Sequence, residues 1–469
     1  MPPTPEALGL ERGKPAKSTV VLASEAALVG RWRELGHPKA RIVERRAVAI
    51  HPARELDVAI LIDPGRFARF GPVTVTGTEY MNPRFVAWYT GLREGEPYDV
   101  DDLERAQAQM RRLGVFQAMR FVEADSITDA GLLPIELQVA ERPMRVFGFG
   151  ANYSTLDGAG VEGYWQHRNL FGQAESLRLE GRVAGLDSAN VEDFNYLFAA
   201  TFVKPGVISP FADFRARVFT DRDNPDTYLA ERVGGNLGLI YRPTERLTLD
   251  AAANLEASRI SDAPIGNGDF LLASLPFGFR YDASDNELNP TEGWRLLGKA
   301  EPFHEFEFDN TGLISELTAT SYFGLGPEDR LVMAFRASAG SIVGTPIDEM
   351  PANRLFYAGG GGSIRGFPYR GVGPTLANGE IIGGRSYFTG SVEARVQVTD
   401  TIGFVPFLDF GNAFRDEFPD FSEELRYGAG IGLRYQTGLG PLRLDLATPL
   451  NPQPGDPSFA FYLGLGQAF

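Results

Sequence analysis

The chain has 469 residues, which is enough for two or three domains. Its 45 Lys and Arg residues against 61 Asp and Glu residues give a net charge of −16, which argues against a nucleic-acid partner. The absence of cysteine excludes disulfides and thiolate metal sites. No uncharged apolar run reaches the roughly 18 residues of a transmembrane helix, but a membrane-spanning strand needs only about 10 alternating residues.

The first third of the chain predicts two small α+β blocks. In the first block, an amphipathic helix is expected at residues 25–35, ended by Gly36-His37-Pro38, with strands at 40–50 and 55–62. The apolar positions of this helix are Ala26, Ala27, Leu28, Trp32 and Leu35. The second block predicts the order strand, helix, helix, strand, strand. These elements are expected at residues 72–75, 83–89, 100–113, 116–123 and 132–139.

After Pro143 the pattern changes to alternating strands at intervals of about 20 residues. In the segment 426–436, one face carries Tyr427, Ala429, Ile431, Leu433 and Tyr435, and the other carries Arg426, three glycines, Arg434 and Gln436. Charged side chains at every second position are stable only where that face meets water, so we expect a barrel with a wet lumen. A soluble β-sandwich or propeller would require one dry face and fewer charges on the other.

About sixteen antiparallel strands are expected, which is an even number that suits a closed outer-membrane barrel. Their starts are predicted near residues 145, 161, 176, 195, 211, 227, 246, 270, 294, 313, 331, 386, 404, 426, 442 and 459.

A glycine-rich loop lies in the longest gap between these strands. Residues 359–368 read Gly-Gly-Gly-Gly-Ser-Ile-Arg-Gly-Phe-Pro, and four consecutive glycines cannot form a stable helix or strand. This stretch resembles the [VI]RGF motif of loop six in the superfamily of outer-membrane barrels that carry periplasmic POTRA domains, the bacterial surface antigen type. The resemblance implies that residues 341–385 form loop six and that the loop folds back into the lumen. The motif residues are Gly362, Ile364, Arg365, Gly366 and Phe367.

In that superfamily the loop arginine meets an F-x-D motif on a late strand and an acidic residue on the preceding strand. Alternation here sends Phe407 and Asp409 into the lumen, and Glu393 and Arg395 with them. The resemblance therefore implies that Glu393, Phe407 and Asp409 are the lumen partners of Arg365. The alternative is that Arg365 binds only carbonyl groups of its own loop.

The N-terminal blocks resemble POTRA domains, with Phe70-Gly71-Pro72-Val73 entering the second block and Leu113-Gly114-Val115-Phe116 joining its second helix to the next strand. This resemblance implies a complete POTRA domain at residues 67–143, part of another at 1–66 whose front half is missing, and the barrel at 144–469. The first residues lack a signal-peptide pattern, although an outer-membrane protein needs one, so we expect the natural start to lie upstream.

The first and last strands must pair to close the barrel. Glycines weaken strands by about 0.5–1 kcal/mol each, so Gly148, Gly150, Gly464 and Gly466 predict a weak lateral seam. The final residues, 461–469, resemble the terminal recognition signal of outer-membrane barrels and end in Phe469, although Gln467 stands where an apolar residue is usual. This form and the segment 440–445 most resemble the TamA subfamily, the outer-membrane subunits of translocation and assembly modules.

The TamA resemblance implies a protein that assists autotransporter-type outer-membrane proteins through the seam without an energy source of its own. It also implies three kinds of partner: an inner-membrane-anchored, periplasm-spanning protein at the POTRA domains, unfolded outer-membrane clients, and outer-membrane lipids. A general barrel-assembly subunit and a two-partner-type secretion pore remain open within the superfamily, and a passive diffusion porin remains open outside it. No catalytic arrangement, cofactor motif or metal-ligand spacing is found.

Overall fold

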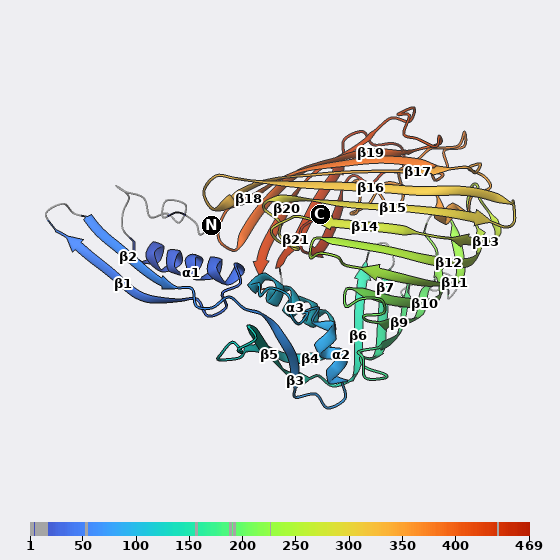
Figure 1. Ribbon diagram of the computed structural model, residues 1–469. Coiled ribbons are helices and arrows are strands. Elements are labelled where there is room, and N and C mark those ends of the chain that lie inside the picture. Colours follow the sequence, from blue (N-terminus) through green and yellow to red (C-terminus); the bar gives the residue numbers. More distant parts are fainter. Residues whose placement is uncertain are drawn as a thin grey trace. The chain divides into compact units, whose positions relative to one another are not determined.

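The computed structural model describes residues 4, 17–51, 55–154, 158–186, 190, 194–225, 227–438 and 440–469 (Figure 1). No helix among these residues is both long enough and apolar enough to cross a membrane. The chain forms two compact units, one of residues 1–146, 167–176 and 204–211, the other of residues 147–166, 177–203 and 212–469. The start of the chain, on which the expectation of missing upstream residues rests, lies outside the described part apart from Thr4.

The first unit begins with helix α1 (Ser18–Glu34) and a two-stranded antiparallel sheet of β1 (Arg41–Ile50) and β2 (Glu55–Asp63). The prediction of the apolar face of this helix is wrong in part, since only Leu28 and Trp32 of its five positions are half-buried. Ala26, Ala27 and Leu35 are exposed, and the buried residues of α1 are Val21, Ser24 and Glu25. The reason is an ion pair between Glu25 and Arg45 of β1, which turns a polar position of the helix toward the sheet.

The second block of this unit has the predicted order of elements. It contains β3 (Arg69–Thr76), α2 (Pro83–Tyr89), α3 (Val100–Arg112), β4 (Phe116–Glu123) and β5 (Leu132–Glu141). β5 lies between the other two strands, parallel to β3 and antiparallel to β4. The helices cover an apolar core that includes Phe85, Val86, Met110, Val115 and Leu137.

The second unit is a closed barrel of antiparallel strands (Figure 1). Its strands are β6 (Arg145–Ser154), β7 (Gly158–His167), β8 (Ser176–Ala184), β9 (Asn195–Lys204), β10 (Ala212–Asp223), β11 (Leu229–Tyr241), β12 (Leu247–Ser261), β13 (Gly268–Ser274), β14 (Phe277–Asp282), β15 (Gly293–Glu305), β16 (Asn310–Leu325), β17 (Leu331–Val343), β18 (Ser386–Gln397), β19 (Ile402–Phe414), β20 (Arg426–Thr437), β21 (Gly440–Pro449) and β22 (Ala460–Leu465). Strands adjacent in the sequence are neighbours, and β22 lies beside β6 to close the barrel.

The seventeen strands occupy sixteen positions, because β13 and β14 are two halves of one strand (17 − 1 = 16). Both halves lie between β12 and β15. The break falls at Leu275 and Pro276, and proline cannot donate a ladder hydrogen bond in the middle of a sheet. The predicted count of about sixteen is therefore confirmed, with one interruption that the pattern did not indicate.

The expected alternation is present in the late strands. In β20, Tyr427, Ile431, Leu433 and Tyr435 are exposed on the outer face, whereas Arg426 and Arg434 are buried on the inner face. Loop six, residues 344–385, joins β17 to β18 and contains one short 3-10 helix, η4 (Ala352–Arg354). The fold therefore brings the charged inner faces of β17–β21 together with this long loop.

The cap of α2 offers a test of the second N-terminal block. The Asn82 side chain accepts hydrogen bonds from the amides of Arg84 and Phe85, at 2.9 and 3.4 Å. We expect Asn82→Ala to speed hydrogen–deuterium exchange of the α2 amides about fivefold, because losing such a cap costs about 1 kcal/mol. Asn82→Asp keeps the acceptor and serves as the control. Equal exchange in all three proteins would contradict the assigned cap.

Candidate functional site

The tip of loop six turns on glycines that need their special backbone freedom. Gly359, Gly360 and Gly366 have φ angles of +101°, +90° and +102°, in the left-handed region that favours glycine. The Ser363 hydroxyl donates to the Gly359 carbonyl at 3.1 Å and accepts from its amide at 2.9 Å, which closes the turn. Gly362 has open space where a Cβ would stand, so its place in the predicted motif has no steric reason here.

Arg365 projects from this turn into a group of carboxylates on the inner barrel wall. Its Nε and Nη2 donate to the two carboxylate oxygens of Asp409 at 2.7 and 2.9 Å, which is a bidentate pair. Its Nη1 lies 2.9 Å from both Glu393 Oε1 and Asp445 Oδ2. The backbone amide of Arg365 also donates to Asp409 Oδ2 at 3.0 Å. One loop residue therefore meets carboxylates from β18, β19 and β21.

The structure brings the predicted partners together. Besides Glu393 and Asp409, the ring of Phe407 lies under the guanidinium, with 3.4 Å between Arg365 Cζ and the ring centre. The hydrogen bonds of the Arg365 side chain within the described residues go to Asp409, Asp445 and the Ser391 hydroxyl. The alternative in which Arg365 binds only loop carbonyls is therefore wrong.

This part of the lumen is dry, unlike the wet lumen expected from the sequence. The Arg365 side chain is 2% exposed, and Glu393, Asp409 and Asp445 are fully buried. Loop six itself excludes water, because its residues Ala358, Ile364, Phe367 and Val372 form a buried apolar cluster at the tip. Burial alone would lower the pKa of Arg365, but the hydrogen bonds and charge of Asp409, with the charges of Glu393 and Asp445, raise it. The guanidinium therefore stays charged.

Sequence reasoning missed five contributors to this site. They are Ser391, Arg395, Arg434, Arg443 and Asp445, and alternation had already placed Arg395 and Arg434 on the inner face. Arg395 donates to Glu393 at 3.0 Å, and Arg434 donates to Asp445 at 2.5 Å. Arg443 Nε also lies 3.8 Å from Asp445 Oδ2, so four arginines pair with three carboxylates. No motif signal marked Asp445, because its pairing with Arg365 depends on which strands the barrel sets side by side.

The predicted seam residues lie in two different places. Gly148 and Gly150 lie in β6 and Gly464 lies in β22, but Gly466 lies beyond the end of β22 at Leu465. The prediction that Gly466 is a strand residue is wrong, because its φ of +85° turns the chain out of the strand. Gly148 also has a packing role, since a Cβ there would overlap the ring of Tyr164 on β7.

The residues after this turn enter the lumen. Arg395 donates to the Phe469 carbonyl at 2.8 Å, and the guanidinium groups of Arg336 and Arg395 lie 5.0 and 5.2 Å from the Phe469 ring centre. The expectation that Phe469 lies at the seam is therefore wrong. Gln467 accepts from Arg434 at 2.8 Å and donates to Asn289 at 2.9 Å. These polar contacts explain why a glutamine stands where an apolar residue was expected.

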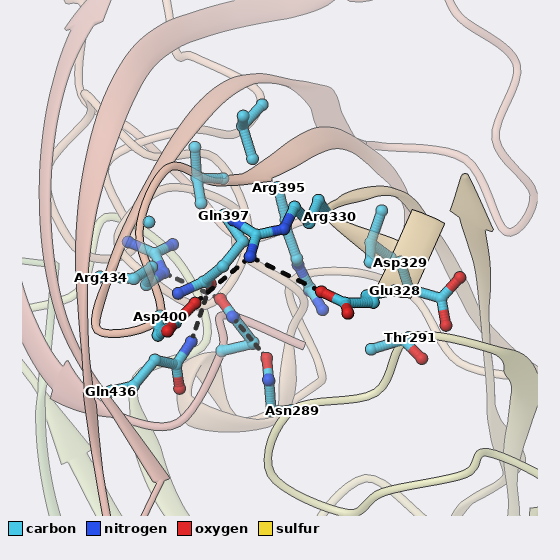
Figure 2. Close-up of a pocket in the computed structure, with 15 residues that line it drawn as sticks. Asn289, Thr291, Glu328, Asp329, Arg330, Arg395, Gln397, Asp400, Arg434 and Gln436 are labelled. Carbon is cyan, nitrogen blue, oxygen red and sulfur yellow. Dashed lines mark hydrogen bonds and ion pairs between the residues drawn. The ribbon is translucent and has the colours of Figure 1, made fainter. Parts of the chain in front are cut away.

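These contacts border a cavity of about 450 Å³, lined by residues from β17–β20 and from the neighbouring turns (Figure 2). Figure 2 shows Arg330 between Glu328 and Asp400, with Arg395 and Arg434 on the wall. Arg434 links the cavity to the loop-six cluster, since it pairs with Asp445 on one side and Gln467 on the other. No group of three or more His, Asp or Glu residues in the described part of the chain could hold a metal ion.

Comparison with known proteins places this arrangement in a family. A family model for the Omp85 superfamily domain matches residues 169–469. The chain belongs to the Omp85 superfamily. Members of this superfamily are outer-membrane proteins, so this Omp85 chain resides in the bacterial outer membrane with its N-terminal part in the periplasm.

Three similar proteins illustrate the relationship. The outer membrane protein assembly factor BamA of Nitratidesulfovibrio vulgaris is 23% identical over 442 residues, covering 88% of this chain and 53% of the relative. BamA of Neisseria meningitidis serogroup B is 22% identical over 477 residues, covering 89% and 58%. The crystal structure of Haemophilus ducreyi BamA lacking POTRA domains 1–3 superposes with a TM-score of 0.68 at 17% identity, covering 97% and 96%, and shares the fold. This Omp85 chain spans about half the length of the two sequence relatives.

Removing the loop arginine tests the ion cluster. We expect Arg365→Ala to lower the free energy of unfolding by roughly 3–5 kcal/mol, because three buried carboxylates lose their shared partner. Urea unfolding of the protein in lipid vesicles, followed by tryptophan fluorescence, measures the change. Arg365→Lys keeps the positive charge but cannot form the bidentate pair with Asp409, so we expect an intermediate loss of unfolding free energy. A loss below about 1 kcal/mol in Arg365→Ala would be typical of an exposed ion pair and would contradict the buried cluster.

The wall beneath the loop offers a second test. A methyl group at Gly428 of β20 would overlap the carbonyl oxygen of Arg365. We therefore expect Gly428→Ala to lift loop six and lower the temperature at which the folded barrel band disappears on unheated gels. Gly438→Ala is the matched control, because a Cβ at Gly438 meets nothing within 4 Å. Equal melting of the two variants would refute close contact between Gly428 and the loop.

Proposed function

We propose that this protein helps outer-membrane proteins to insert into or cross the outer membrane through the seam between β22 and β6, without an energy source of its own. The observation that carries the proposal is the unequal length of the seam strands. β6 has ten residues and β22 has six, so at least four residues of β6 extend beyond its partner (10 − 6 = 4). An unpaired strand edge is a template for another strand.

The chemistry of the seam supports strand addition. Backbone hydrogen bonds bind an incoming strand without requiring a particular sequence, which suits a protein with many clients. The outer faces of the seam strands carry exposed apolar side chains, among them Phe147, Phe149, Phe461 and Leu463, which face the lipid in this reading. A client strand that joins the edge of β6 would place its own apolar face in the same membrane layer. The seam is therefore the proposed client site.

The N-terminal unit has a matching role in this proposal. We infer that residues 67–143 form a complete POTRA domain and residues 1–66 part of another, since the β3-α2-α3-β4-β5 order is that of the POTRA fold. Extended client segments or a periplasmic partner would bind these domains by strand addition. An inner-membrane-anchored partner that spans the periplasm would follow from the TamA-like form of the last strands.

The choice within the superfamily is part of the proposal. The sequence of the last strands favours a TamA-type protein with autotransporter-type clients. The names of the two BamA relatives favour the second candidate, a general barrel-assembly subunit. The number of POTRA domains in the natural full-length gene distinguishes them, because the general subunit typically has five. A large neighbouring gene with one N-terminal membrane anchor would support the TamA type.

A diffusion porin is the candidate of another class. The buried cluster around Arg365 argues against it, because loop six enters the lumen and is held against its wall, where a porin has a water channel. Large and steady single-channel conductance in planar bilayers would favour the porin instead.

Locking the seam tests the proposed route. The chain has no cysteine, so pairs of cysteines can be introduced across the seam. One cysteine replaces Phe147 or Phe149 of β6 and the other replaces Phe461 or Leu463 of β22, and the pair that forms a disulfide on oxidation is chosen. We expect oxidation of that pair to abolish client assembly into vesicles and reduction to restore it. The control pair is Leu433 and Leu444, which face each other across β20 and β21 away from the seam. Full activity with the seam locked would refute the proposal.

A further inference from the structure

Loop six carries a second arginine that pairs with carboxylates on another part of the wall. Arg354, the last residue of η4, places Nη2 3.0 Å from Glu256 Oε2 of β12 and Nη1 3.4 Å from Glu301 Oε1 of β15. Glu301 is almost fully buried and also pairs with Lys299 at 2.6 Å. These contacts share no residue with the Arg365 cluster.

Apolar contacts hold the same part of the loop. Met350 and Leu355 are buried in a cluster with residues of β13, β15, β16 and β17. Ala352 is buried with residues of β11–β13, and its amide donates to the Gly266 carbonyl at 3.3 Å. Gly266 allows this approach, because a Cβ there would overlap the Met350 carbonyl oxygen. The segment around η4 therefore packs against a complementary surface of the inner barrel wall.

The two arginine sites use different strands of the barrel wall, β12 and β15 for Arg354 and β18, β19 and β21 for Arg365. Counting the β13–β14 pair as one position in a barrel of sixteen, the separation of these strands runs from three positions, between β15 and β18, to eight, between β12 and β21. Arg354 reaches β12 and Arg365 reaches β21, although only eleven residues separate them (365 − 354 = 11). The 42 residues of loop six (385 − 344 + 1 = 42) would have many conformations if they were tethered only at their ends. These internal attachments, together with that of Arg370 to Asp223 of β10 at 3.5 Å, remove most of that freedom.

We propose that Arg354 is a second positioning residue of loop six, which anchors the loop to β12 and β15 independently of the Arg365 cluster. The loop then crosses the lumen and is attached to the inner wall at more than one point. Loss of either arginine releases only the part of loop six around that arginine. The other arginine and the buried apolar side chains keep the rest of the loop on the wall. The inference concerns the position of the loop and does not depend on the proposed assembly function.

A single thiol can report on the Arg354 end. Ala352 is 1% exposed and lies two residues from Arg354, and the chain has no natural cysteine. In Ala352→Cys, the rate of reaction with a water-soluble maleimide measures how often this end leaves the wall. We expect Arg354→Ala to raise that rate by about tenfold or more. We expect Arg365→Ala to change it by less than about twofold, since that variant frees the other end.

The matched control is Arg330→Ala, which removes an arginine with two ion pairs to exposed acids, Glu328 and Asp400, and leaves loop six untouched. Its labelling should equal that of the parent. Each variant is compared only as the folded barrel, isolated by its mobility on unheated gels. If Arg354→Ala does not fold, Arg354→Gln and Glu256→Gln remove the same ion pair with little change in size. Unchanged labelling in the Arg354 variants, or equally fast labelling in Arg365→Ala, would overturn the proposal.

Discussion

The structure depends on one buried guanidinium shared by three carboxylates. Arg365 reaches Glu393, Asp409 and Asp445, which stand on three different strands of the late barrel. Buried carboxylates cannot remain charged and unpaired without a large free-energy cost. Loop six must therefore lie against this wall whenever the barrel has its closed form. The apolar tip of the loop excludes water, and the resulting low dielectric strengthens each pairing.

The same cluster reaches the end of the chain. Arg395 joins Glu393 to the Phe469 carbonyl, and Arg434 joins Asp445 to Gln467. Loop six also touches the last strand directly, since the Gly366 amide donates to the Tyr462 hydroxyl at 3.0 Å. The position of the loop and the state of β22 are thus physically connected. Any movement of the seam on the β22 side must rearrange hydrogen bonds of charged groups in the lumen.

Much of the barrel could be predicted from the sequence, because a strand between lipid and lumen repeats with period two. Every predicted strand start lies within three residues of an observed one. Pairing partners are harder, since they depend on contacts between strands distant in the sequence. The roles of Glu393, Phe407 and Asp409 could be predicted from a sequence motif. No motif marks Asp445 or Arg354. The break at Pro276 and the turn at Gly466 were missed because single residues override an otherwise regular pattern.

The most direct test of the loop-six cluster is an electron cryo-microscopy map of the protein in lipid nanodiscs, at a resolution that separates side chains. The present account predicts that density for the Arg365 guanidinium lies within hydrogen-bond distance of Asp409 and beside Glu393 and Asp445, inside a closed barrel. Density that places the Ile364-Arg365-Gly366-Phe367 turn outside the lumen, with the three carboxylates facing water, would contradict it.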